Sequence, residues 1–298
     1  MRIPFKERAI SMGLQADDNA GLYSYSDRYS KIVYRQCKTG ASEIQHPTDN
    51  QDIPIIGIFT SAPDSDEFKY VGSVSEIYKF IGNEPLNNSI VQSITSVGNA
   101  IVSQNALMSY DFTRIRNEII IQNTQSVQQV GDIMPVMIVN NSYNGTKAAS
   151  ISFGLALNDG GHQLVFAFEL GEMRQVHIAS SSAEMRTAIT SYMDIFSNDI
   201  TQLVTDSFNT QVTEDQMLAT LDLIEKVGKR KREEVSKLLE EITGQGQLPS
   251  AWQLFLAIVR YSSFEPNINL RKLLENAAES VLVIPARMYS VLEQLENL

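Results

Sequence analysis

The segment IMPVMIVNNSYNGTKAASISFGLALNDGGHQLVFAFEL, residues 133–170, decides the fold of this chain. Apolar residues alternate with small or polar ones in its later parts, and a period of two is typical of strands with one buried face. Asn144-Gly145 and Asp159-Gly160-Gly161 separate the apolar parts with residues that tolerate the positive φ of tight hairpin turns. The segment therefore predicts an antiparallel β-meander with an aromatic-rich buried face.

The period changes from two to 3.6 after the meander. From Ser181 to the end, apolar residues recur at helical spacing, with capping signals and glycines between the helical stretches. The expected fold class is α+β: an antiparallel β-meander with packed helices, followed by a helical C-terminal half. We expect a mixed region over 1–180 and a helical region over 181–298, either separate or as one continuous domain.

Local patterns predict further elements on both sides of the meander. Short apolar runs favour strands over 53–60, 67–72 and 116–122. Capping signals and helical spacing favour helices over 73–82, 88–108 and 213–242, the last running on past a glycine.

Composition limits the class of protein. The 298 residues carry a net charge of −11, with 43% hydrophobic and 20% charged residues, which is typical of a globular protein. The single cysteine, Cys37, excludes an intramolecular disulfide and a thiolate metal cage. The N-terminal residues lack the apolar core of a secretory signal, and no run reaches the roughly 18 apolar residues of a membrane span. We therefore expect a cytoplasmic protein without membrane contact, in the host cell if it is phage-encoded.

Motifs of the commonest enzymes are absent. The sequence contains no phosphate-binding glycine loop, no dinucleotide fingerprint, no paired-histidine zinc motif and no nucleophile elbow. We expect no cofactor, no metal site and no catalytic residue. His162 or His177 could act as an acid–base group, and the alternative is that both are histidines at hairpin edges. Asp64 and Asp66 could bind a metal, and the alternative is a polar turn. Cys37 could be a nucleophile, and the alternative is an unreactive thiol.

The first 38 residues are locally basic, with seven Lys or Arg against four Asp or Glu. Tyrosines interleave with the cations there, and single-stranded nucleic acid is held by aromatic stacking beside a cationic track. The alternative is a β-rich edge whose tyrosines pack on the core. Base stacking is assigned to Tyr25 and Tyr29, and phosphate contacts to Arg28, Lys31, Arg35 and Lys38.

A second basic stretch lies at residues 226–237, where six cations fall within twelve residues. Closely spaced cations suit the phosphates of a nucleic-acid backbone. The alternative is a solvated helix face, since five glutamates lie within pairing distance along the helix. The second phosphate track is assigned to Lys229, Arg230, Lys231 and Arg232.

Two segments together resemble a known family. VMIVNNSYNG at 136–145 and PSAWQLFLAIVRY at 249–261 are similar to motifs of a phage- and plasmid-encoded family known mainly as a domain of unknown function. The likeness spans about residues 110–285 and implies a mobile-element origin without an established activity.

The order of elements carries a second likeness. A meander followed directly by a long helix, 182–206, is similar to the core of phage single-strand annealing proteins, which oligomerise and hold single-stranded DNA in a basic groove. The resulting hypothesis is a non-enzymatic phage or plasmid protein in DNA metabolism that binds single-stranded DNA as a homo-oligomer. The alternatives are a protein-interaction or structural phage component (a virion subunit or an inhibitor of a host factor) and an enzyme using His162 or His177.

Overall fold

The computed structural model describes residues 10, 13–17, 22–26, 31–36, 44–45, 52–53, 55–62, 64–65, 67–75, 80–143, 149–168, 173–174 and 182–282. The chain forms two compact units. The N-terminal unit comprises residues 1–90, 108–116 and 140–149, and the C-terminal unit comprises 91–107, 117–139 and 150–298. These units group strands with the helices that cover them, whereas a division at residue 180 follows the change from strand to helix.

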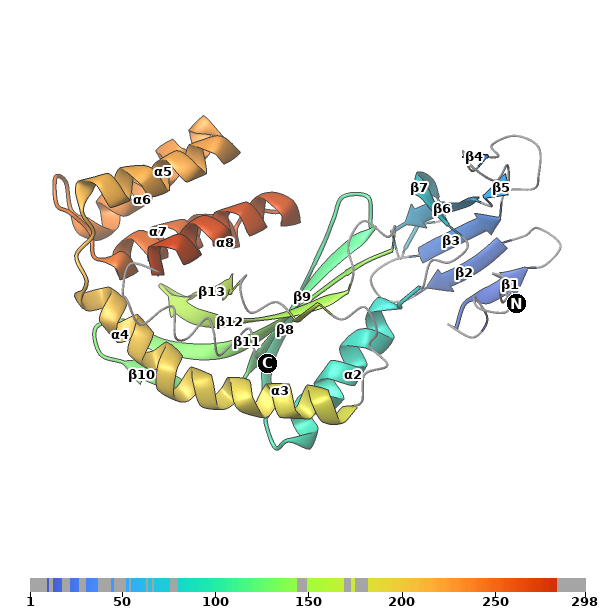
Figure 1. The fold of residues 1–298 in the computed structure, drawn as a ribbon, viewed down its shortest axis with the longest axis horizontal. Coiled ribbons are helices and arrows are strands. Elements are labelled where there is room, and N and C mark those ends of the chain that lie inside the picture. The colour runs from blue at the N-terminus through green and yellow to red at the C-terminus, as the bar shows by residue number, and fades with distance from the viewer. Residues whose placement is uncertain are drawn as a thin grey trace. The chain divides into compact units, whose positions relative to one another are not determined.

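The N-terminal unit is built on a five-stranded sheet in the order β1-β2-β3-β6-β7 (Figure 1). All four pairings in this sheet are antiparallel. A separate two-stranded pair consists of β4, Ile44–Gln45, and β5, Asp52–Ile53. The strands of the main sheet are β1 (Gln15–Asp17), β2 (Leu22–Ser26), β3 (Lys31–Gln36), β6 (Ile55–Ser61) and β7 (Lys69–Ser75).

The core of the unit packs against one face of this sheet. Ile32 and Tyr34 of β3 and Ile58 of β6 are fully buried there and pack with Phe80 and Tyr143. The Tyr34 hydroxyl donates to the Tyr143 carbonyl at 3.1 Å, which satisfies both buried polar groups. The other face of the sheet therefore carries the alternate residues of each strand.

The C-terminal unit contains most of a seven-stranded sheet, ordered β13-β12-β11-β9-β8, in which β10 pairs with β11 and β14 with β12. Gly160 and Gly161, with φ of 57° and 89°, form the tight turn that sets Asp159 opposite His162. This confirms the antiparallel meander. The strands are β8 (Ile101–Met108), β9 (Arg114–Ile121), β10 (Gln125–Val127), β11 (Gly131–Ser142), β12 (Ser150–Asp159), β13 (His162–Ala167) and β14 (Met173–Arg174).

The sheet curls so that its two end strands approach each other. The Ser103 hydroxyl of β8 donates to the side-chain oxygen of Gln163 of β13 at 3.1 Å. Gly154 of β12 lies close to the neighbouring strand: an added Cβ would lie 2.0 Å from the Phe166 carbonyl oxygen of β13. A side chain at Gly154 is therefore incompatible with the close approach of β12 and β13.

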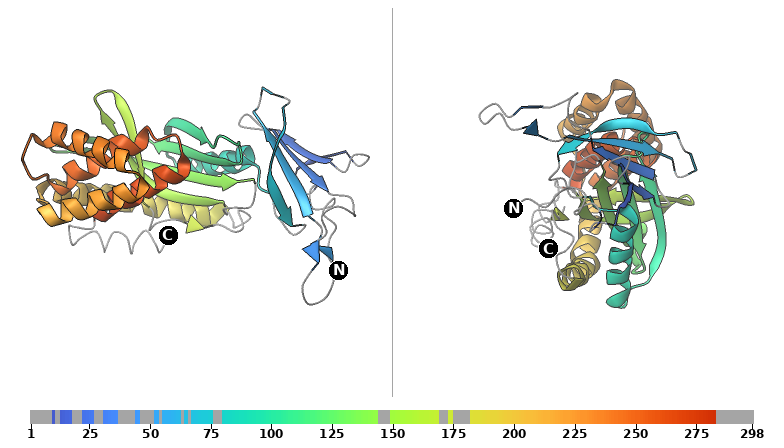
Figure 2. Two further views of the ribbon diagram at one scale, coloured as in Figure 1. Left: turned by 90° about the horizontal axis from the view of Figure 1, so that it is seen from above. Right: turned by 90° about the vertical axis from the view of Figure 1, so that its right-hand side faces the viewer.

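Helices cover the aromatic face of β12 and β13 (Figure 1; Figure 2). Phe153 stacks on Tyr192 of α3, with ring centroids 4.3 Å apart, and Phe166 meets Phe255 of α7 edge to face at 4.9 Å. In Figure 1, α7 and α8 lie against β13, and α5 and α6 pack outside them. The helices are α2 (Asn83–Ser96), α3 (Ser182–Ile195), the π-helical η1 (Phe196–Ile200), α4 (Thr201–Asn209), α5 (Glu214–Val227), α6 (Lys229–Thr243), α7 (Ala251–Ser263) and α8 (Ile268–Leu282).

A buried ion pair joins α8 to the sheet. The Arg271 guanidinium lies 2.8 Å from the Glu118 carboxylate of β9 and donates to the Val165 carbonyl at 3.1 Å. Arg271 also lies 3.5 Å from Glu275, and all three charged side chains are almost completely buried. Loss of the guanidinium would therefore remove the cation that two buried carboxylates share.

Three predicted helices differ from the structure. Ser73 lies in β7, because pairing with β6 outweighs the local capping pattern. The helix expected over 88–108 ends at Ser96, and Gly98 with φ of 85° turns the chain into β8. The helix expected over 213–242 is interrupted at Gly228, which separates α5 from α6.

Candidate nucleic-acid interface

The N-terminal sheet carries aromatic side chains on the face opposite its core. Val33 of β3 lies opposite Phe59 of β6, and Phe59 lies opposite Tyr70 of β7. The Phe59 and Tyr70 ring centroids are 5.5 Å apart at 62°, and the Tyr70 side chain is 62% exposed. Phe59 and Tyr70, with Val33 beside Phe59, form a line across three strands that we call the aromatic row. An exposed ring held against a second ring is the kind of platform on which nucleobases stack.

Side-chain hydrogen bonding fixes the exposed ring of the row. The Tyr70 hydroxyl is 2.7 Å from the Ser73 hydroxyl on the same strand. The ring therefore presents its surface to solvent with its polar end already hydrogen-bonded, which lowers the entropy lost when a base stacks on it.

One described cation lies on the face of the aromatic row. Lys31 lies opposite Ser61, two residues from Val33 on the same strand, so its side chain shares this face. Lys69 lies opposite Thr60, so its side chain is on the other face of β7, where its ammonium lies 5.6 Å above the ring centroid of Tyr110. The row therefore combines Lys31 with the exposed ring of Tyr70.

The loop that carries Tyr110 is fastened to the sheet. The Thr60 hydroxyl of β6 donates to the Asp111 carbonyl at 2.5 Å. The Asp111 carboxylate accepts from the Ser109 hydroxyl at 2.6 Å and from the Thr113 hydroxyl at 2.8 Å. Burial raises the pKa of Asp111, but these hydrogen bonds together outweigh it and hold the pKa below the ordinary value.

The predicted stacking residue Tyr25 lies on the core face of the sheet. It is opposite Ile32, and its ring centroid lies 4.8 Å from that of Phe80 and 6.2 Å from that of Tyr143. The structure therefore places this tyrosine as the core-packing alternative describes. Phe59 and Tyr70 were missed because the sequence predicts their strands without indicating which face is covered.

The other N-terminal assignments are only partly described. Lys31 is partly exposed, at the position given above. Arg35 lies in β3 with its Cα opposite Gly57, but its side chain is outside the described residues. Arg28, Tyr29 and Lys38 are also outside the described residues.

The second basic track lies in the first turns of α6, where carboxylates pair with its cations. Arg230 lies 2.8 Å from Glu234, Lys231 pairs with Glu265, and Arg232 pairs with Asp222 at 2.9 Å and with Glu225. The hydrogen bond with Glu225 is the main cause that raises the pKa of Arg232. Lys229 is exposed and pairs with no carboxylate among the described residues. This arrangement is that of a helix face neutralised by its own glutamates and by neighbouring carboxylates.

The candidates for catalysis and metal binding are dispersed. His162 is exposed at the start of β13, with its ring edge to face against Phe264 at 5.7 Å, and Asp64 lies in a turn. Cys37, Asp66 and His177 are outside the described residues. In the part of the chain that the structure describes, no three His, Cys, Asp or Glu side chains are grouped as metal ligands would be. No helix in the same part is long and apolar enough to cross a membrane.

Comparison with known proteins found no match for this chain. The chain matches no family model, no curated protein and no solved structure. The functional argument therefore depends on the chain's own geometry and charge.

Charge is divided unequally between the two units. The N-terminal unit has 12 basic and 13 acidic residues, a net charge of −1. The C-terminal unit has 12 basic and 22 acidic residues, a net charge of −10. A polyanion is therefore repelled mainly by the C-terminal unit, and the aromatic row belongs to the unit that is almost neutral.

Proposed function

We propose that the protein binds single-stranded DNA through the face of the N-terminal sheet that carries the aromatic row. The observation that carries the proposal is the exposed ring of Tyr70, held against Phe59, with Lys31 on the same face of the sheet. Each stacked base contributes about 1–3 kcal/mol, and flanking cations contact the phosphates.

The charge distribution supports this choice of surface over α6. Three of the four cations at 229–232 are already paired with carboxylates, and they belong to the acidic unit. A phosphate at α6 would have to displace those carboxylates, whereas at the aromatic row it meets a unit with almost no net charge.

The wider context is part of the same proposal. The protein acts without catalysis in phage or plasmid DNA metabolism, as an oligomer in the host cytoplasm. The resemblance of 136–145 and 249–261 to a phage- and plasmid-encoded family supports the context, and the meander followed by a long helix supports a role in strand annealing.

Fluorescence anisotropy with a labelled oligothymidylate of about 20 nucleotides tests DNA binding. Tyr70→Ala removes one stacking surface and is expected to weaken binding about fivefold to a hundredfold. Lys31→Gln is expected to lower the slope of log K against log salt by about 0.7, the value for one lost phosphate contact.

Lys229→Gln is the matched control, because it removes the same charge from α6. Unchanged affinity in Lys229→Gln supports the sheet surface. No binding at about 50 mM salt, or an equal loss in Lys229→Gln and Lys31→Gln, would contradict it.

A second candidate function is capture of a basic protein, as a structural phage component or an inhibitor of a host factor. The net charge of −10 on the C-terminal unit favours it, since complementary charge accelerates association. A stoichiometric host partner recovered from nuclease-treated lysate, together with no DNA binding, would favour this candidate.

A further inference from the structure

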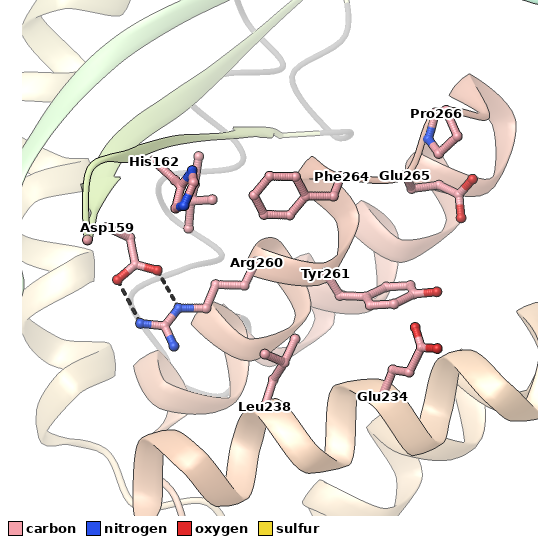
Figure 3. Close-up of a pocket in the computed structure, with 11 residues that line it drawn as sticks. Asp159, His162, Glu234, Leu238, Arg260, Tyr261, Phe264, Glu265 and Pro266 are labelled. Atoms are coloured by element: carbon pink, nitrogen blue, oxygen red, sulfur yellow. Dashed lines mark hydrogen bonds and ion pairs between the residues drawn. The ribbon is translucent and has the colours of Figure 1, made fainter.

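The C-terminal unit contains a pocket of about 620 Å³ that the proposed DNA surface does not use (Figure 3). Its walls come from the β12–β13 turn, from α6, and from the end of α7 with the loop that follows. The volume falls within the range of small-molecule sites, roughly 300–1,000 Å³.

The middle of the pocket is apolar. Leu164 of β13 and Leu238 of α6 line it from two sides, and the Phe264 ring lies between His162 and Tyr261 in Figure 3. Phe264 is 67% exposed, which is unusual for a large aromatic side chain beside a cavity. A ligand with a hydrocarbon body would cover this ring.

The polar groups at the rim are mainly acceptors. The carboxylates of Asp159, Glu234 and Glu265 line the pocket, and the cation among its lining residues is Arg260. The Arg260 guanidinium is occupied, since it donates two hydrogen bonds to the two oxygens of Asp159, one of them at 2.6 Å. Each carboxylate also has a cationic partner, because Glu234 pairs with Arg230 and Glu265 with Lys231. The pair of Glu234 is open to exchange, since the Arg230 side chain is 89% exposed, so an added cation can reach this carboxylate.

The two glutamates keep acceptor capacity for a ligand. A carboxylate has about four acceptor sites. Glu265 uses two of these, for the Lys231 ammonium and for the Asn267 amide at 3.1 Å, and Glu234 accepts from Arg230 at 2.8 Å. The hydrogen bond from Arg230 is the main cause that holds the pKa of Glu234 below its ordinary value, so this carboxylate is ionised at neutral pH.

The same wall already holds an ammonium group. Lys231 Nζ lies 5.4 Å from the ring centroid of Tyr261 while it pairs with Glu265. A ring face beside a carboxylate is the arrangement that attracts organic cations. The net charge of −10 on this unit raises the local concentration of such cations.

From this geometry we infer that the pocket binds an alkylammonium or alkylguanidinium group. Its charge lies toward Glu234 and Glu265, and its carbon chain lies along Leu164, Leu238 and Phe264. The group comes from a free polyamine or from a lysine or arginine side chain of another protein, since both present the same chemistry. This inference does not depend on DNA binding.

Calorimetric titration with hexylamine and with hexanoate tests the sign of the ligand charge on one carbon chain. We expect saturable binding of hexylamine at one site and none of hexanoate. Glu234→Gln and Phe264→Ala should each weaken hexylamine binding roughly twofold to fivefold. Glu240→Gln, an exposed change on α6 away from the pocket, is the control and should bind as the unmodified protein does.

Further titrations identify the source of the group. Tighter binding of spermidine than of a capped lysine peptide indicates a free polyamine, and the reverse order indicates a basic protein. Binding of hexanoate as tight as that of hexylamine overturns the inference. Absence of saturable amine binding also overturns it. An equal loss of hexylamine affinity in Glu240→Gln and Glu234→Gln overturns it too, because it would show that the net negative charge of the unit attracts the amine without a specific pocket.

Discussion

The Tyr192 hydroxyl connects α3 to two neighbouring strands, and Tyr192→Phe isolates its contribution. The fully buried phenol donates to the Gly154 carbonyl of β12 and accepts from the Val136 amide of β11 at 3.4 Å. The substitution keeps the ring stacked on Phe153 and removes only the oxygen. The change therefore tests a hydrogen bond with little change in packing.

The magnitude follows from the groups left behind. A buried backbone group that loses its partner costs about 1–3 kcal/mol. The contact with Val136 is long at 3.4 Å, so the Gly154 carbonyl should supply most of the loss. We expect the free energy of unfolding to fall by about 1–3 kcal/mol, which lowers Tm by roughly 2–5 °C in a protein of 298 residues.

Trp252 provides a local probe for the measurement. It is the single tryptophan of the chain, is 3% exposed, and lies in α7 beside Phe255, so its fluorescence in urea follows the C-terminal unit. Tyr110→Phe removes a hydroxyl from an exposed ring and should leave stability within about 0.5 kcal/mol. A Tyr192→Phe protein within the same margin would refute the assignment of the hydroxyl as a structural link.

Alkaline pH gives a second measurement of the same group. Burial raises the pKa of Tyr192 above the ordinary value of 10.0, despite the two backbone hydrogen bonds. A raised pKa in the folded state means that the neutral phenol stabilises the fold fully below pH 10, and that this stability is lost as the pH rises further. The urea midpoint should therefore fall more steeply above about pH 10 in the wild-type protein than in Tyr192→Phe.

Two further substitutions test the close approach of β12 and β13 and the loop that is fastened to β6. Gly154→Ala places a Cβ 2.0 Å from the Phe166 carbonyl oxygen and should cost about 3 kcal/mol or more by Trp252 fluorescence. Gly228→Ala places no atom closer than 3.6 Å and should cost only about 1 kcal/mol, for the loss of glycine at the N-cap of α6. Equal stability of the two variants would contradict the packing argument. Asp111 has a lowered pKa, so it stabilises the fold above about pH 4 and loses this effect as the pH falls. The protection factors of β6 and β7 amides, taken against the intrinsic exchange rate at each pH, should therefore fall on acidification in the wild type. An equal fall in Asp111→Asn would exclude the carboxylate as the cause.

The parts of the fold that could be predicted have a strong local period. Alternation in β12 and β13 and the glycines at 160–161 determine that hairpin before any long-range contact is considered. Apolar spacing likewise locates α3 and α8, and the Thr213–Gln216 capping box marks the start of α5. In these cases local preference and tertiary packing favour the same structure.

The errors occur where tertiary pairing outweighs a local pattern. Ser73 and Glu76 have the spacing of a capping box, but β6 offers a strand partner and β7 forms instead. In 88–108, Ile90 and Ile94 have helical spacing, whereas β8 is a half-exposed strand with weak alternation, so Ile101 was assigned to the helix. Neither outcome follows from one chain segment considered alone.

The candidate site could be predicted in residue type but not in position. A strand such as Leu22–Ser26 alternates tyrosine with serine, which predicts two faces without indicating which one the rest of the chain covers. Phe80 and Tyr143 cover the face of Tyr25, so we propose base stacking on Phe59 and Tyr70, which lie on the other face. The covering residues are distant in sequence, and only the folded chain identifies them.

The net charge of −11 at first counts against nucleic acid, but a net charge averages over regions that a ligand never contacts together. Divided at residue 180, the chain has −5 and −6, and neither half favours a polyanion. Divided by compact units it has −1 and −10, because residues 91–107, 117–139 and 150–180, with five acidic residues against one basic residue, belong to the same unit as the helices. Electrostatic attraction falls off over about 10 Å at ordinary salt, so each surface responds to the charge of its own unit. The same distribution that leaves the aromatic row accessible to a phosphate chain makes the pocket beside α6 selective for cations, and added salt should weaken both interactions.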